Sequence, residues 1–125
     1  MRKCQKEILS LSNKDHRYLK LAMNLAMSSD CNFKHGAVIV KGGRVISTGI
    51  NRFKNHPKAV SPEHIKQYCS VHAEVDAIRK LKSARGATIY VARIGKRGNR
   101  ALSRPCPNCY AAIKSAGIAK IVYTN

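Results

Sequence analysis

Two short motifs in the second half of the chain supply the side chains of a zinc site. His72 stands two residues before Glu74, and a cysteine pair, Cys106 and Cys109, follows directly after Pro105. Zinc binds imidazole and thiolate readily, and a catalytic zinc site uses three protein ligands while leaving a fourth position to water. His72, Cys106 and Cys109 make three ligands, which leaves the carboxylate of Glu74 free for proton transfer. The chain must therefore fold so that two distant segments meet at one metal.

A Cys-x-x-Cys pair alone is not specific, because it also occurs in redox sites, in structural zinc sites and as unrelated buried thiols. A structural zinc site would need a fourth ligand at suitable spacing, and a thioredoxin-like pair would follow the first strand of a β-α-β unit. Neither context is evident. Pro105 suits the position before a helix and Pro107 its first turn, so both cysteines would lie at a helix N-terminus, where the helix dipole favours thiolates.

The composition is typical of one compact domain spanning 1–125. A chain of 125 residues buries a real core without disulfide staples, and its five cysteines do not resemble a disulfide framework. No apolar run approaches the length of a membrane span, and the first residues lack the apolar region of a secretory signal. We therefore expect a cytoplasmic protein that does not enter a membrane.

The charge is strongly positive. Lys and Arg number 24 against six Asp and Glu, which gives a formal net charge of +18. Such a field attracts polyanions and phosphorylated small molecules, so a single-stranded nucleic acid is a candidate partner. Aromatic residues make up only 6% of the chain and tryptophan is absent, which leaves few platforms for stacking bases.

The apolar periodicity and turn residues predict alternating strands and helices. Helices are expected over about 13–27, 72–82 and 107–116, and strands over 36–40, 44–49, 87–92 and 119–124, with a glycine turn joining the first two strands in a hairpin. An irregular loop over 51–62 leads to a short helix capped by Ser61. The prediction is an α/β fold in which a mixed sheet of about four strands, beginning with an antiparallel hairpin, has helices on its faces.

In such a sheet, helix N-termini gather along the carboxyl edge of the strands, so the two halves of the zinc site can meet there. A basic loop over 93–104 ends directly at the cysteine motif and is a candidate for binding phosphate. Its basic residues are Arg93, Lys96, Arg97, Arg100 and Arg104.

These motifs resemble the zinc-dependent cytidine and deoxycytidylate deaminase superfamily over nearly the whole chain. His72-Ala73-Glu74 resembles the motif of the deoxycytidylate, tRNA-adenosine and DNA-editing branches, which begins with a histidine. Small cytidine deaminases have a cysteine at that position. Gly49-Ile50-Asn51 resembles the family's Gly-x-Asn, whose asparagine positions the base. The resemblance implies a three-layer α/β/α fold of the cytidine-deaminase type.

Two features differ from the family pattern. Family members usually add a helix and a fifth strand after the strand that is expected here over 119–124. The glycine-proline turn with which deoxycytidylate deaminases recognise phosphate is not recognisable after Asn51, where Arg52 follows directly.

The resemblance implies a zinc-dependent hydrolase of nucleotide metabolism that acts on the C–N bond of a cyclic amidine. A cytosine nucleotide of the deoxycytidylate type would become the uracil nucleotide, with release of ammonia. Zinc would lower the pKa of a water molecule, and Glu74 would relay its proton to the ring nitrogen and the departing amine. Asn51 and the backbone at Ala73 would orient the base, Arg97 and Arg104 would contact its phosphate, and no organic cofactor is needed.

Other interpretations stay open at this point. The enzyme could act on cytosine or adenine within single-stranded DNA or RNA, or the chain could be a zinc-stabilised nucleic-acid-binding module without catalysis, although such a module has no use for Glu74. A homo-oligomer is a further candidate assembly. Ligands of a second zinc could come from Cys31, His35, His56, His64 and Cys69.

Overall fold

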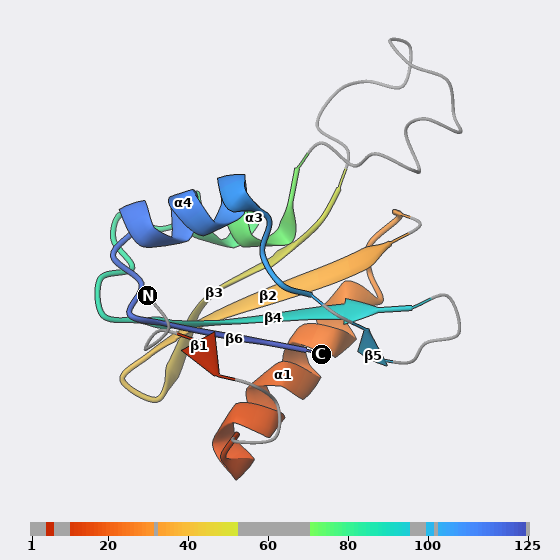
Figure 1. Ribbon diagram of the computed structural model, residues 1–125, viewed down its shortest axis with the longest axis horizontal. Helices are drawn as coiled ribbons and strands as arrows, with labels where there is room; N and C mark the ends of the chain where they lie inside the picture. Colours follow the sequence, from red (N-terminus) through yellow and green to blue (C-terminus); the bar gives the residue numbers. More distant parts are fainter. Residues whose placement is uncertain are drawn as a thin grey trace, which may run out of the picture.

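The computed structural model of the 125-residue chain describes residues 5–6, 11–31, 33–52, 71–95, 100–101 and 103–124. The described residues form one sheet and three helices (Figure 1). The helices are α1 (Asn13–Ala26), α3 (Ala73–Ile78) and α4 (Pro107–Ser115). The strands are β1 (Gln5–Lys6), β2 (Lys34–Lys41), β3 (Arg44–Ile50), β4 (Thr88–Ile94), β5 (Arg100–Ala101) and β6 (Lys120–Tyr123).

The sheet is mixed, with strand order β1-β6-β4-β2-β3 and with β5 paired to β4. β2 is antiparallel to both β3 and β4, whereas β6 is parallel to β4. All four strands expected from the sequence are present, and the hairpin of β2 and β3 is confirmed. β1, parallel to β6, and β5, antiparallel to β4, were not expected because strands of two residues have no alternating pattern.

Two glycines make the turn of the hairpin. Gly42 and Gly43 have φ angles of 61° and 74°, which are left-handed conformations that residues with a β-carbon adopt only at a cost. A two-residue turn with positive φ at both positions matches the right-handed twist of the adjoining strands.

Helices cover both faces of the sheet (Figure 1). Alternate residues of the strands point to opposite faces, so Val38 and Tyr90 pack with Leu19 of α1, whereas Ile39 and Ile89 belong to the core beneath α3 and α4. The expected three-layer α/β/α arrangement is therefore confirmed.

Helix α1 begins with a capping box. The Oγ of Ser12 accepts a hydrogen bond from the backbone N–H of Asp15, and the Asp15 carboxylate accepts one from the N–H of Ser12. Asp15 is buried, and the hydroxyl of Tyr90 on β4 donates a hydrogen bond to it at 2.7 Å. The cap therefore also attaches the first turn of α1 to the centre of the sheet.

Two glycines allow helices to approach the sheet closely. A β-carbon on Gly36 would lie 2.1 Å from the carbonyl oxygen of Ala22 in α1, and one on Gly49 would lie 2.4 Å from the carbonyl oxygen of Ala73 in α3. These distances are far below van der Waals contact, so backbone lies directly on backbone at both positions. The second contact sets the position of the helix that follows His72.

Two expected boundaries were wrong. Helix α3 ends at Ile78, with Arg79 as its C-cap, and not near Lys82. The apolar spacing suggested a longer helix because Leu81 packs against the same core from the turn after it. Arg93 lies within β4 and not in a loop, because β4 continues to Ile94, where it pairs with Lys34. Of the loop expected over 51–62, only Asn51 and Arg52 are among the described residues, and the helix expected after Ser61 lies outside them.

The segment before the cysteine motif is fixed by Ser103 and Thr124, which are both buried. The Oγ of Ser103 donates to the carbonyl oxygen of Val91 at 2.7 Å, and its N–H donates to the carbonyl oxygen of Thr124 at 2.9 Å. The N–H of Thr124 in turn donates to the Oγ of Ser103 at 2.9 Å. These bonds join the chain just before Cys106 to β4 and to the end of β6.

Candidate metal centre

The structure brings together the three side chains that the sequence assigned to zinc. His72 is the N-cap of α3, Cys106 is the N-cap of α4, and Cys109 lies in the first turn of α4. Their ligand atoms all lie within 4.8 Å of one another. The Nδ1 of His72 is 3.1 Å from the Sγ of Cys109 and 3.7 Å from the Sγ of Cys106. Tetrahedral zinc at its usual bond lengths would separate a nitrogen and a sulfur ligand by about 3.6 Å, so this set fits zinc.

The start of α4 holds both cysteines in place. Pro107 occupies the first turn, and the N–H of Cys109 donates to the Sγ of Cys106 at 3.4 Å. Burial raises the pKa of the Cys109 thiol, and the neighbouring Glu74 and Cys106 raise it further. A thiolate at this position is therefore stable only beside a cation, which agrees with a metal site.

Glu74 lies in the first turn of α3, two residues after His72, and only 4% of it is exposed. Burial raises the pKa of its carboxyl group, although a hydrogen bond from its own N–H and the nearby His72 act in the opposite direction. A raised pKa makes the carboxyl group a better proton acceptor than an exposed glutamate, which suits a general acid-base group.

Asn51 follows β3 and is buried, with 6% exposed. Its Oδ1 accepts a hydrogen bond from the N–H of His35 at 2.9 Å, and its Nδ2 donates to the carbonyl oxygen of Phe33. Asn51 thus stabilises the segment that enters β2, a role that was not anticipated from the sequence. One amide hydrogen and one lone pair of the side chain have no protein partner among these bonds.

The other residues that the sequence assigned to substrate or phosphate binding lie in different parts of the structure. Ala73 is fully buried as the first residue of α3. Arg104 is exposed, with its guanidinium 6.0 Å from the centre of the Tyr123 ring. Arg93 lies 4.8 Å above the ring of Phe33. Arg97 lies outside the described residues.

A groove of about 490 Å³ adjoins the metal ligands. The described residues that line it are Arg52, Val71, His72, Val75, Arg79, Asn108 and Cys109. No sequence pattern predicts Arg52 and Arg79 at this groove, because the two residues belong to segments whose proximity depends on the packing of α3 on β3.

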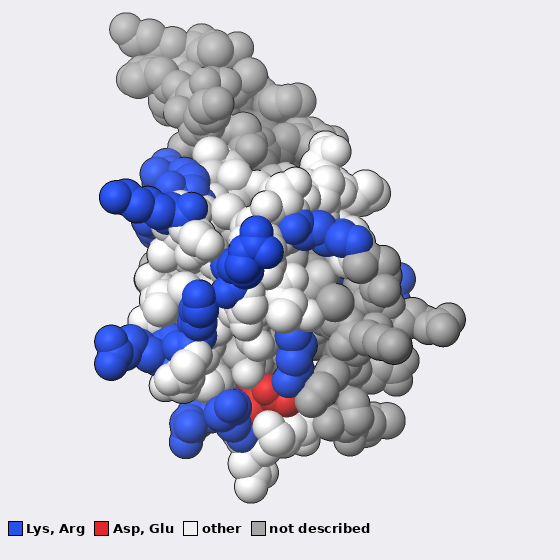
Figure 2. Space-filling view, turned by 90° about the vertical axis from the view of Figure 1, so that its left-hand side faces the viewer, with Lys and Arg blue, Asp and Glu red and all other residues white. Residues whose placement is uncertain are grey.

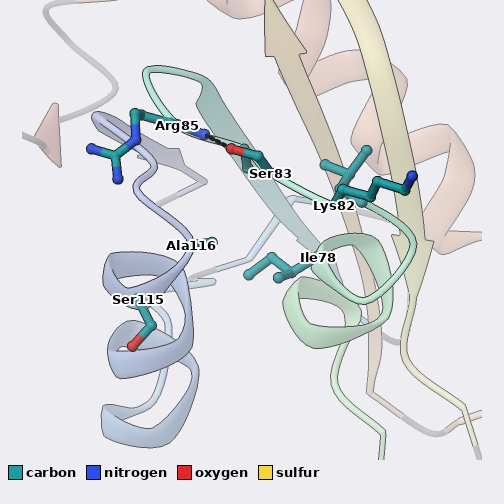
Figure 3. A pocket seen from close by; sticks show the side chains of 8 residues that line it. Ile78, Lys82, Ser83, Arg85, Ser115 and Ala116 are labelled. Carbon is teal, nitrogen blue, oxygen red and sulfur yellow. Dashed lines mark hydrogen bonds between the residues drawn. The ribbon is translucent and has the colours of Figure 1, made fainter.

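A second hollow, of about 320 Å³, lies where α3 and α4 end, away from the metal ligands at their starts. The side chain of Ile78 points toward Ala116, while Lys82 and Arg85 extend away from the hollow in opposite directions (Figure 3). No His, Cys, Asp or Glu is among its described lining residues, so it has no metal chemistry of its own.

Positive charge is spread over the face of the molecule that Figure 2 shows. On the side where α4 ends, Figure 2 shows lysines and arginines scattered across the face with one small acidic area. None of the described helices is long and apolar enough to cross a membrane.

Within the part of the chain that the structure describes, His72, Cys106 and Cys109 form the one group of three side chains close enough to bind a metal. Cys31, a candidate ligand of a second zinc, is buried and disulfide-bonded, so it has no thiolate to offer a metal, and the expectation that the cysteines form no disulfide was wrong for this residue. His35 is half-buried, and His56, His64 and Cys69 lie outside the described residues, so the second site stays a prediction.

Comparison with known proteins agrees with this geometry. Residues 12–125 match the family described as the cytidine and deoxycytidylate deaminase zinc-binding region. The deoxycytidylate deaminase of Mycobacterium phage D29 is 32% identical over 128 residues, which cover 87% of this chain and 92% of that protein. The deoxycytidylate deaminase of Enterobacteria phage T2 is 30% identical over 133 residues, covering 77% of this chain and 71% of that protein.

A solved structure, the apo dCMP deaminase of cyanophage S-TIM5, superposes with a TM-score of 0.67 at 25% identity, covering 90% of this chain and 84% of that chain. The chain belongs to the zinc-binding cytidine and deoxycytidylate deaminase family.

Proposed function

We propose that this protein is a hydrolytic deaminase that converts a cytosine nucleotide of the deoxycytidylate type to the uracil nucleotide and ammonia. The observation that carries the proposal is the buried Glu74 carboxyl group beside three converging zinc ligands. Relatives named deoxycytidylate deaminase support the choice of a nucleotide substrate.

The residues of the site have separate tasks. His72, Cys106 and Cys109 would hold the zinc, which when bound would supply the Lewis acid that makes water nucleophilic at neutral pH. Glu74 accepts the proton of the attacking water and passes it to the ring nitrogen of cytosine. It then takes the second proton of the added water and delivers it to the departing amine, so that the C–N bond breaks, ammonia leaves and the water oxygen remains as the carbonyl of the uracil base.

The base is positioned by neighbouring groups. The free hydrogen-bonding capacity of the Asn51 amide and the backbone N–H at Ala73, at the start of α3, are proposed to contact the ring. Arg97 and Arg104, from the segment before the cysteine motif, are proposed to contact the phosphate. A cytoplasmic location and a homo-oligomeric state complete the proposal.

The test is the release of ammonia from a panel of free nucleotides and single-stranded oligonucleotides. Glu74→Gln should retain zinc and fold but lose activity by about 10²–10⁴-fold, because it removes general acid-base transfer without changing the shape of the side chain. The matched control is Asp30→Asn, the same change at an exposed acid, which should retain full activity. Normal turnover by Glu74→Gln would remove Glu74 from the mechanism.

A further inference from the structure

Asp76 lies on α3 two residues after Glu74, and only 3% of it is exposed. Its Oδ1 accepts hydrogen bonds from the Nε and Nη2 of Arg52 at 3.2 and 3.1 Å, and from the Nε of Arg79 at 3.0 Å. The Nη2 of Arg79 is 2.8 Å from the same oxygen. One buried carboxylate oxygen therefore holds two guanidinium groups side by side.

The other oxygen of Asp76 is also occupied. Oδ2 accepts a hydrogen bond from the N–H of Ile50 at 3.2 Å and lies 3.5 Å from the Nζ of Lys80. Burial acts to raise the pKa of Asp76, but these hydrogen bonds and cations outweigh it and hold the pKa below its ordinary value. The carboxylate is thus charged at neutral pH.

The cluster has an excess of positive charge. Three cations, Arg52, Arg79 and Lys80, share the single negative charge of Asp76, so two positive charges remain uncompensated within it. Each guanidinium uses its Nε edge on Asp76, so among the described residues Nη1 and the outer hydrogens have no partner and can bind a second anion.

Two of these three cations line the groove that contains the metal ligands. Arg52 is fixed by paired backbone hydrogen bonds with Val71, at 3.0 and 3.1 Å, directly before His72. Arg79 lies seven residues after His72, on the same side of α3 as Val75, which also lines the groove. At 1.5 Å per residue this separation is about 10 Å along the helix, comparable to the length of a mononucleotide.

We propose that Arg52 and Arg79, held together by Asp76, bind a phosphate group attached to the nucleoside whose base is deaminated. Paired guanidinium groups suit phosphate oxygens, because their planar N–H donors match the geometry of the anion. Asp76 is a positioning residue that fixes both side chains in advance. The site rests on the proposed deaminase function. It places the phosphate at the groove and is an alternative to phosphate contacts from Arg97 and Arg104, so the variants below decide between the two assignments.

The experiment compares dCMP with deoxycytidine, which lacks the phosphate. Arg52→Gln and Arg79→Gln should each raise the KM for dCMP by about tenfold or more and leave kcat/KM for deoxycytidine unchanged, because they remove charge-assisted hydrogen bonds to phosphate alone. Lys80→Gln is the matched control, since Lys80 also pairs with Asp76 but does not line the groove and should leave both substrates unaffected.

A second arm identifies the source of the phosphate. Affinity for a single-stranded oligodeoxycytidylate is measured at two salt concentrations. If the site binds a phosphodiester, this affinity falls in Arg52→Gln and Arg79→Gln, and its dependence on salt becomes shallower. Loss in either arm supports the phosphate site and names its source. Unchanged behaviour in both arms, or equal losses with dCMP and deoxycytidine, overturns it.

Two further measurements keep the result interpretable. Arg52→Lys and Arg79→Lys retain the ion pair with Asp76 and are used if Arg52→Gln or Arg79→Gln does not fold. Each Lys substitution should raise the KM for dCMP by a smaller factor than the Gln substitution at the same position. Calorimetric binding of dUMP against deoxyuridine tests the phosphate site without catalysis. If the protein does not deaminate but binds dUMP in a manner that depends on Arg52 and Arg79, the proposed activity is rejected and the phosphate site is retained. If the wild-type protein binds dUMP and deoxyuridine equally, the phosphate site is rejected.

Discussion

A β-carbon added to Gly49 would lie 2.5 Å from the backbone nitrogen of Ala77, so strand β3 and helix α3 are in direct backbone contact. The atoms that a larger side chain would meet belong to the helix that carries Glu74 and begins after His72. They cannot rotate out of the way, as the end of a flexible side chain could.

Gly49→Ala should therefore lower both stability and zinc affinity. Overpacking of this kind typically costs about 1–3 kcal/mol, and displacement of α3 would move His72 relative to Cys109. Gly36→Ala is the matched control, because its β-carbon would meet Ala22 on the opposite face. It should lose stability but keep the zinc affinity of the folded protein. Urea unfolding and competition with a chelator measure the two quantities; unchanged zinc affinity in folded Gly49→Ala would contradict this account.

Removal of one cysteine ligand should release the metal. Cys106→Ala and Cys109→Ala each delete one of three protein ligands, and we expect both variants to lose zinc on dialysis, whereas the wild-type protein holds at least one zinc per chain. Asn108→Ala, which changes the exposed residue between them, should keep its zinc. Elemental analysis decides the matter, and full zinc occupancy in either cysteine variant would show that the ligand set is wrong.

The hydrogen bond between Tyr90 and Asp15 predicts a pH-dependent contribution to stability. Burial acts to raise the pKa of Asp15, but hydrogen bonds from Tyr90 and Ser12 and the charge of Lys120 hold it below its ordinary value of 3.8. A depressed pKa in the folded state stabilises the protein above the unfolded-state pKa, and this contribution disappears as the pH falls through the folded-state pKa.

Asp15→Asn should accordingly be less stable than wild type by about 1.5–3 kcal/mol at pH 7, the usual worth of hydrogen bonds to a buried charged group. The difference should narrow as the pH falls below about 4, because the carboxylate of the unfolded chain then takes up a proton before that of the folded protein does. Urea unfolding of both proteins from pH 7 to pH 3 gives this difference directly. A gap that stays constant across the range would show that the charge of Asp15 does not contribute.

The parts of the fold that the sequence predicted have local causes. The capping box of Ser12 and Asp15 begins α1, and Gly42 and Gly43 make the hairpin turn, because the signals lie within a few residues of one another. The metal ligands were also predictable, since few arrangements of histidine and paired cysteines serve another chemistry.

The roles that the sequence did not predict depend on contacts between distant segments. In the sequence, nothing singles out Asp76 among the six acids. Its contact with Arg52 depends on the packing of α3 on β3. Asn51 was expected to contact substrate, and its hydrogen bonds to Phe33 and His35 follow from the register of the hairpin. The two-residue strands β1 and β5 have no pattern of their own, because each is defined only by its neighbour.

The hydrogen bonds between Ser103 and Thr124 affect where the chain can accept an insertion. Gly95 follows β4, and Ser103 is fastened to β4 and β6 before the metal ligands begin, so the segment between them enters and leaves at two anchored points. Each doubling of a loop's length costs only about 0.6 kcal/mol of closure entropy. An insertion between Gly95 and Ser103 should therefore cost little stability and leave Cys106 and Cys109 where they are.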